Sequence, residues 1–193
     1  KANRLSKPFN AIKALNSFTF APATFVPFRD QRAVAKVRAI RRGDITRHRN
    51  PDFRITVMPD ADLEHRWITD MFFRVSEAMA EGRTYVMIMP NPWPGYAKLA
   101  RMLNRARVDC RRLHTFNMDE YADENGRIAP ETWEFGFGHA FKKYFHAELD
   151  PKLRPPERQI HVFTDRNLKD YGRMLADLGG ADICYSGPAE IDR

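Results

Sequence analysis

Short apolar runs that alternate with helix-period segments constrain this chain more than any other feature of its sequence. Residues 84–89 (TYVMIM) form a near-continuous apolar run, as expected for a strand that is covered on both faces. Over residues 62–81, apolar side chains recur at three- and four-residue spacings, which predicts an amphipathic helix. Because strands that alternate with helices indicate βαβ units, we predict an α/β fold. Its sheet is expected to be open, mostly parallel and Rossmann-like, with helices on both faces.

The same two periods predict the remaining elements after residue 50. Further strands are expected over 53–58, 111–117, 159–163 and 181–186, and further helices over 96–104, 131–147 and 167–178. Asp60 or Asp62 is available to cap the helix over 62–81. Gly179 and Gly180 are expected to end the last helix.

The first 50 residues differ from the rest in both charge and pattern. They carry 12 Lys and Arg residues against Asp30 and Asp44, whereas the remaining residues carry 20 basic and 23 acidic side chains. We divide the chain into an irregular, basic N-terminal extension (1–50), with one helix expected over 32–42, and an α/β domain (51–193). The extension is expected to pack on its own domain or on a neighbouring subunit. Nucleic-acid binding by its arginines is the less favoured alternative.

Composition narrows the class of protein further. No apolar run approaches the ~20 residues that a membrane span requires, so we expect no membrane association and a cytoplasmic location. The two cysteines, Cys110 and Cys184, lie in separate apolar runs, which favours two buried thiols over a disulfide. The six histidines lack the i, i+4 spacing of helical zinc motifs, and we predict no metal site.

The stretch from Leu113 to Tyr121 (LHTFNMDEY) is the strongest candidate for chemistry. It begins as an alternating strand and ends in two adjacent carboxylates, Asp119 and Glu120. Ligands of open α/β sheets bind beyond the carboxyl ends of the strands, where these acids are expected. A carboxylate in such a place can act as a general base. A solvated acidic turn is the alternative interpretation of the same pattern.

The residues around this stretch resemble the glucosamine-6-phosphate deaminase (isomerase) family. Residues 115–121 (TFNMDEY) are similar to the family's signature, in which a strand ends and its aspartate faces the sugar. Residues 130–133 (PETW) resemble the Pro-Glu-Ser-Tyr that opens the family's next helix, and residues 179–184 (GGADIC) resemble its Gly-Gly-Ile-Asp strand. Related 6-phosphogluconolactonases carry Asp-Glu-Arg where this chain has Asp-Glu-Tyr, which favours the deaminase branch.

The resemblance implies an aldose-ketose isomerisation of an amino-sugar phosphate, coupled to the loss of ammonia, without a cofactor or metal. Glucosamine 6-phosphate would become fructose 6-phosphate. Asp119 would be the general base that moves a proton between C2 and C1. Glu120 and Tyr121 would orient Asp119 or line the pocket. Independently of the resemblance, Asn91 is a candidate to hold a phosphate, and Trp93, in the Pro-rich loop, is a candidate to stack on a sugar face or close the pocket. The family also implies a homo-oligomer.

Two departures from the family separate this chain from its typical members. The phosphate loop of the family is rich in Gly and Thr, whereas residues 90–96 read PNPWPGY, and three prolines remove three N–H donors. After residue 187 the family's Gly-His-Ile-Ala-Phe, whose histidine assists ring opening, does not follow. We expect the chain to be a piece of a longer protein; a variant that lacks this half of the site is the alternative. A non-catalytic sugar-phosphate-binding or regulatory protein, or a 6-phosphogluconolactonase-like hydrolase, remains the alternative function.

Overall fold

The computed structural model of the protein describes residues 30–90 and 93–187, which belong to two compact units, residues 1–57 and 58–193. In the described part of the first unit, α1 (Gln31–Arg38) begins after Asp30, whose carboxylate accepts the backbone N–H groups of Arg32 and Ala33 at 3.0 Å. This is ordinary N-capping. None of the side chains of α1 is buried. A short 3₁₀ turn, Arg42–Asp44, follows.

The prediction of a strand over residues 53–58 is wrong. These residues are described and form no strand, and the side chains of Phe53 and Val57 are 57% and 59% exposed. An apolar run forms a strand only where a neighbouring strand accepts its backbone hydrogen bonds, and within residues 30–90 and 93–187 no strand pairs with residues 53–58.

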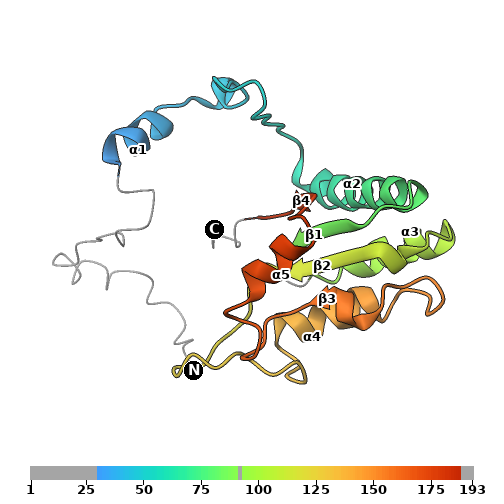
Figure 1. Ribbon diagram of the computed structural model, residues 1–193. Helices are drawn as coiled ribbons and strands as arrows, with labels where there is room; N and C mark the ends of the chain where they lie inside the picture. Colours follow the sequence, from blue (N-terminus) through green and yellow to red (C-terminus); the bar gives the residue numbers. More distant parts are fainter. Residues whose placement is uncertain (1–29, 91–92, 188–193) are drawn as a thin grey trace, which may run out of the picture. The chain divides into compact units, whose positions relative to one another are not determined.

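The second unit alternates helices and strands as predicted (Figure 1). Its elements are α2 (Asp60–Ala80), β1 (Tyr85–Met89), α3 (Tyr96–Arg105), β2 (Leu113–Asn117), α4 (Phe137–Phe141), β3 (Ile160–His161), α5 (Tyr171–Asp177) and β4 (Ile183–Cys184). A π-helical turn, Lys142–His146, continues α4. The N-cap residue of α2 is Pro59, without a side-chain bond, so neither Asp60 nor Asp62 has the predicted capping role.

The four strands form one parallel sheet in the order β3-β2-β1-β4. In the register of the central pair, Met87 lies beside Thr115 and Met89 beside Asn117. Because β4 pairs on the opposite side of β1 from β2, the connections change direction between β1 and β4. Ligands of doubly wound sheets bind at such a switch point. The predicted fold class, an α/β protein with a parallel sheet, is confirmed.

One face of the sheet carries the hydrophobic core. Side chains of alternate strand residues, such as Met87 and Leu113, are buried against α2 and α3. The helices contribute the buried side chains of Met71, Val75, Leu99 and Leu103, among others, at helical spacing. Phe141 and Phe145 from α4 and the π turn complete the same cluster.

The opposite face is covered in part by α5. Tyr171 contacts the buried ring of Phe116 edge-on at 5.4 Å, and its hydroxyl donates to the carbonyl of His161 at 2.8 Å. On the same face the Nδ1 of His114 and the Nε2 of His161 lie 3.2 Å apart. Cys184, in the edge strand β4, is exposed, which corrects the prediction that both thiols are buried. Both cysteines are free.

In the part of the chain that the structure describes, the longest helix, α2, is too polar to cross a bilayer, and the other helices are shorter still.

Candidate active site

The carboxyl ends of β1, β2 and β4 meet at one edge of the sheet, as predicted. The N–H of Met118 donates to the carbonyl of Met89 at 2.8 Å, and the N–H of Tyr185 donates to that of Ile88 at 3.0 Å. The Ser186 hydroxyl, after β4, lies 3.9 Å from the Met118 sulfur, after β2. The segments that follow these three strands therefore start side by side, and Asp119 is the first carboxylate beyond them.

Asp119 has the properties of a weakly acidic carboxyl group. It lies two residues beyond the end of β2, and part of the residue faces solvent. Two effects raise the pKa of Asp119 above its ordinary value. Partial desolvation is the larger one, and the negative charge of Glu120 is the smaller. A carboxylate with a raised pKa is a stronger base than a fully solvated one, which suits proton abstraction from carbon.

Glu120 points into the protein and binds backbone. Its Oε1 accepts the N–H groups of Tyr121 at 2.9 Å and Phe137 at 2.8 Å, and its Oε2 accepts the N–H of Gly138 at 2.7 Å. Phe137 and Gly138 are the first residues of α4, whose N–H groups have no partner within the helix. Glu120 thus ties the segment after β2 to α4, and it orients the neighbouring Asp119 through the backbone.

This anchor explains why α4 begins later than predicted. The helix was expected from residue 131, but residues 131–136 form turns, with the N–H of Gly136 bonded to the carbonyl of Trp133 at 2.9 Å. Phe135, expected near one side of that helix, is 67% exposed. The segment that resembles the family's Pro-Glu-Ser-Tyr therefore precedes the helix here and does not open it.

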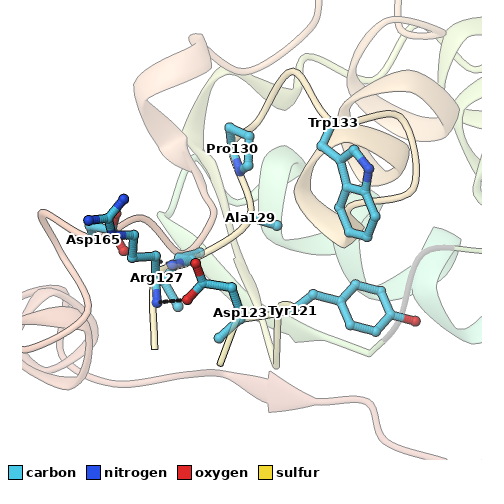
Figure 2. A pocket seen from close by; sticks show the side chains of 9 residues that line it. Tyr121, Asp123, Arg127, Ala129, Pro130, Trp133 and Asp165 are labelled. Carbon is cyan, nitrogen blue, oxygen red and sulfur yellow. Dashed lines mark hydrogen bonds between the residues drawn. The ribbon is translucent and has the colours of Figure 1, made fainter. Parts of the chain in front are cut away.

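Tyr121 lines an open pocket of about 450 Å³ beside this segment (Figure 2). The ring of Trp133 stands across from that of Tyr121, with centroids 5.6 Å apart and planes at 78°. Asp123, Arg127 and Asp165 lie at the other end of the pocket. Asp119 and Glu120 are not among its lining residues.

Trp93 belongs to an aromatic cluster at the edge of the core. Its ring contacts those of Trp67 at 5.8 Å and Tyr96 at 5.6 Å, and the residue is half-buried. A Cβ on Gly95 would come within 2.5 Å of the Trp93 ring, so the loop after β1 needs glycine there. The structure thus gives Trp93 a packing contact on that loop. Asn91, the other predicted ligand from this loop, lies outside the described residues.

The start of α3 offers few donors to a phosphate. The N–H groups of Tyr96, Ala97 and Lys98 donate to the carbonyls of Trp93, Pro94 and Gly95 at 3.0, 3.1 and 2.8 Å. The ammonium group of Lys98 is paired with the Glu64 carboxylate. The sequence prediction that this loop lacks the usual phosphate donors therefore has a structural counterpart.

Asp182, in the segment that resembles Gly-Gly-Ile-Asp, has a structural contact. Its Oδ2 accepts the N–H of Val86 at 2.7 Å and its Oδ1 accepts a guanidinium N–H of Arg83 at 3.0 Å. These bonds attach β4 to the start of β1. Within the described residues, no group of three or more His, Cys, Asp or Glu side chains could hold a metal ion.

Sequence reasoning predicted that Asp119 and Glu120 lie beyond the carboxyl end of a strand, but it did not predict the hydrogen-bond partners found there. The binding of Glu120 to Phe137 and Gly138 has no local signal, because seventeen and eighteen residues separate the partners. Asp165 reaches the pocket from the segment after β3, and its Oδ1 accepts the N–H of Ile128 at 2.7 Å. Only the tertiary fold brings these residues together.

Together, the switch point and the carboxylate beyond β2 define an α/β protein with a candidate ligand site at the carboxyl edge of its sheet. No family model matches the sequence. The chain is 25% identical over 123 residues to a Caenorhabditis elegans glucosamine-6-phosphate deaminase, covering 59% of this chain and 43% of that protein. It is 29% identical over 115 residues to a Candida albicans glucosamine-6-phosphate isomerase, covering 51% and 42%.

These partial similarities support a divergent member of the glucosamine-6-phosphate deaminase (isomerase) family. The chain spans less than half the length of these curated relatives. Among solved structures, a monomeric glucosamine-6-phosphate deaminase of the NagB superfamily aligns with a TM-score of 0.48 at 15% identity, covering 61% of this chain and 49% of that one.

Proposed function

We propose that this protein isomerises and deaminates an amino-sugar phosphate, with glucosamine 6-phosphate as substrate and Asp119 as the general base. The observation that carries the proposal is the position of Asp119 at the carboxyl edge of the sheet, with a raised pKa, in a chain of this family. Because both matched relatives bear names that include glucosamine 6-phosphate, the same sugar phosphate is the first substrate to test.

The chemistry requires a base that is held over C2 of the open-chain sugar. The Asp119 carboxylate takes the proton from C2 and returns it to C1 through an enediol-like state. The C2–N bond then has imine character, water adds at C2, and ammonia leaves, so that a 2-ketose phosphate remains. Desolvation, and to a smaller extent the negative charge of Glu120, raise the pKa of Asp119 and so favour the first step.

The test is to incubate the full-length protein with glucosamine 6-phosphate and to measure ammonia and fructose 6-phosphate. We expect both products in equal amounts. Asp119→Asn should lower kcat by about 10²–10⁴-fold, the usual contribution of a general base. Asp123→Asn, four residues further along the same segment, is the matched control and should retain activity. Equal turnover of wild type and Asp119→Asn would exclude Asp119 as the base.

One observation favours a second candidate, a protein that binds a sugar phosphate without turning it over. The first N–H groups of α3 are already bonded within the loop that precedes the helix, and the prolines of that loop supply no donors. This candidate predicts calorimetric binding of glucosamine 6-phosphate without formation of ammonia. Formation of ammonia at any rate that depends on Asp119 would contradict it.

A further inference from the structure

Neither Asp119, the proposed base, nor Glu120 lines the pocket between Tyr121 and Asp165. Its volume of about 450 Å³ falls within the range of small-molecule sites, roughly 300–1,000 Å³. The two arms of its loop are joined by a bridge between Ala122 and Ile128. Asp165, from the segment after β3, closes one end (Figure 2).

The other end of the pocket is aromatic and open to solvent. The side chains of Tyr121 and Trp133 are 50% and 40% exposed, and their rings stand nearly at right angles. The ring of Phe137 packs against the ring of Tyr121, with the two centroids 4.5 Å apart. Two large exposed rings that are held by their neighbours present preformed apolar and π surface to a ligand.

The end opposite the rings is acidic. The Oδ1 of Asp123 accepts the N–H groups of Asn125 and Arg127 at 2.9 and 2.8 Å, and the Oδ1 of Asp165 accepts the N–H of Ile128. In the described residues, hydrogen bonds engage only this one oxygen of each carboxylate. The backbone therefore holds both acids through one oxygen, and the second oxygen of each takes part in none of these bonds.

The charges of the lining residues determine whether the pocket favours a cationic or an anionic ligand. The lining contains two acidic side chains, Asp123 and Asp165, and one basic side chain, Arg127, so the pocket has a net negative charge. A phosphate would be repelled by the two carboxylates, whereas a cation would be attracted by them and by the π faces of Tyr121 and Trp133.

We propose that this pocket binds a primary ammonium group that is carried on a six-membered ring. The ammonium group would bond to the second carboxylate oxygens of Asp123 and Asp165, and the ring would pack against Tyr121 and Trp133. The proposal does not depend on catalysis by Asp119, because it uses different side chains and a ligand without phosphate.

The experiment is calorimetric titration of the full chain with benzylamine, and with benzyl alcohol as its uncharged counterpart. At this exposed site we expect benzylamine to bind with a Kd on the order of 1 mM, and benzyl alcohol to bind at least about tenfold more weakly. Asp165→Asn keeps an oxygen for the Ile128 N–H but removes the charge, and should weaken benzylamine about three- to tenfold. Asp177→Asn, an exposed change on α5, is the control and should have no effect.

A spectroscopic measurement on the unmodified sequence makes the test independent of whether a variant folds. In protein with labelled tryptophan side chains, benzylamine should shift the indole resonance of Trp133 and leave those of Trp67 and Trp93 in place. The proposal is overturned if the amine and the alcohol bind equally, if folded Asp165→Asn binds as the wild type does, or if the Trp133 resonance does not move at 20-fold the expected Kd.

Discussion

The Glu120 carboxylate accepts the backbone N–H of Gly138 at 2.7 Å, and so joins the segment after β2 to the first turn of α4. Two more N–H groups, of Tyr121 and Phe137, bond to the same carboxylate. In the adjacent pair of acids, one is thus committed to backbone while the other, Asp119, lies at the candidate active site.

Replacement of Glu120 tests this division of roles. Glu120→Ala removes the acceptor of three N–H groups and should lower the free energy of unfolding by about 2–4 kcal/mol, because charged acceptors contribute more than neutral ones. Glu120→Gln should cost less, since its Oε1 can still accept two of these bonds. Urea denaturation measures both, with Glu124→Gln, an exposed acid on the same segment, as the control.

The same Glu120→Gln variant should change the pH dependence of activity. The charge of Glu120 contributes to the raised pKa of Asp119, so its removal lowers that pKa. Since the base must be deprotonated, the acidic limb of the kcat/KM profile should move to lower pH. A limb that stays in place would show that desolvation alone sets the pKa of Asp119.

Position 138 has no room for a larger residue than glycine, because neighbouring side chains lie close to it. A Cβ at this position would lie 3.0 Å from the Val162 Cβ and 3.3 Å from the Glu120 Oε2. Gly138→Ala should therefore lower the free energy of unfolding by about 1–3 kcal/mol. Gly172→Ala on α5, where a Cβ would meet nothing within 4 Å, is the matched control. Equal stability of the two variants would contradict the packing described here.

The pair His114 and His161 should make the domain sensitive to acid. Burial, and then the neighbouring His114, lower the pKa of His161 to about 4. Between pH 6.5, the ordinary pKa of histidine, and pH 4, the unfolded chain binds this proton and the folded protein does not, so stability falls as the pH falls. The loss between pH 8 and pH 5 should reach roughly 2 kcal/mol.

His161→Phe should remove that part of the pH dependence, because phenylalanine can still stack on Phe116, as the imidazole does at 4.1 Å. Chemical denaturation at pH 8 and at pH 5 measures the difference. His65→Gln, an exposed position on α2, should leave it unchanged. If wild type and His161→Phe lose the same stability on acidification, His161 does not titrate as described.

The sequence predicted those helices and strands whose apolar residues recur at the spacing of a single buried face. The helix over 62–81 and the strand over 84–89 agree with α2 and β1 to within two residues, because both pack directly on the core. Residues 53–58 have the same strand-like composition, but no strand in the part of the chain that the structure describes pairs with them. Composition cannot report whether a partner is present, which is why that prediction was wrong.

The candidate site, like the fold, was predictable from the sequence only in part. The place of Asp119 follows from the rule that ligands bind beyond the carboxyl ends of strands, and local sequence shows where β2 ends. The late start of α4 does not follow, because it depends on the carboxylate of Glu120, a distant residue. The burial of Cys110 and the exposure of Cys184 differ for a related reason, since β4 is an edge strand and only the topology shows this.

The two thiols should therefore react differently. Cys110 is fully buried, and burial together with the charge of Asp109 raises its pKa to about 12, which suppresses the reactive thiolate. Cys184 is exposed. Folded protein at pH 8 should react rapidly with one equivalent of a thiol reagent, and Cys184→Ser should abolish this reaction while Cys110→Ser preserves it. Rapid reaction of two thiols in the folded protein would contradict the burial of Cys110.

The most direct test of the account is to follow the proton that Asp119 is proposed to move. Full-length protein and glucosamine 6-phosphate are incubated in D₂O, and deuterium at C1 of the ketose product is measured by NMR. If Asp119 takes the C2 proton and exchanges it with solvent, deuterium enters C1 in the wild type and in Asp123→Asn, and incorporation falls by about 10²-fold or more in Asp119→Asn. Incorporation at the wild-type rate in Asp119→Asn would contradict the assignment of Asp119 as the base.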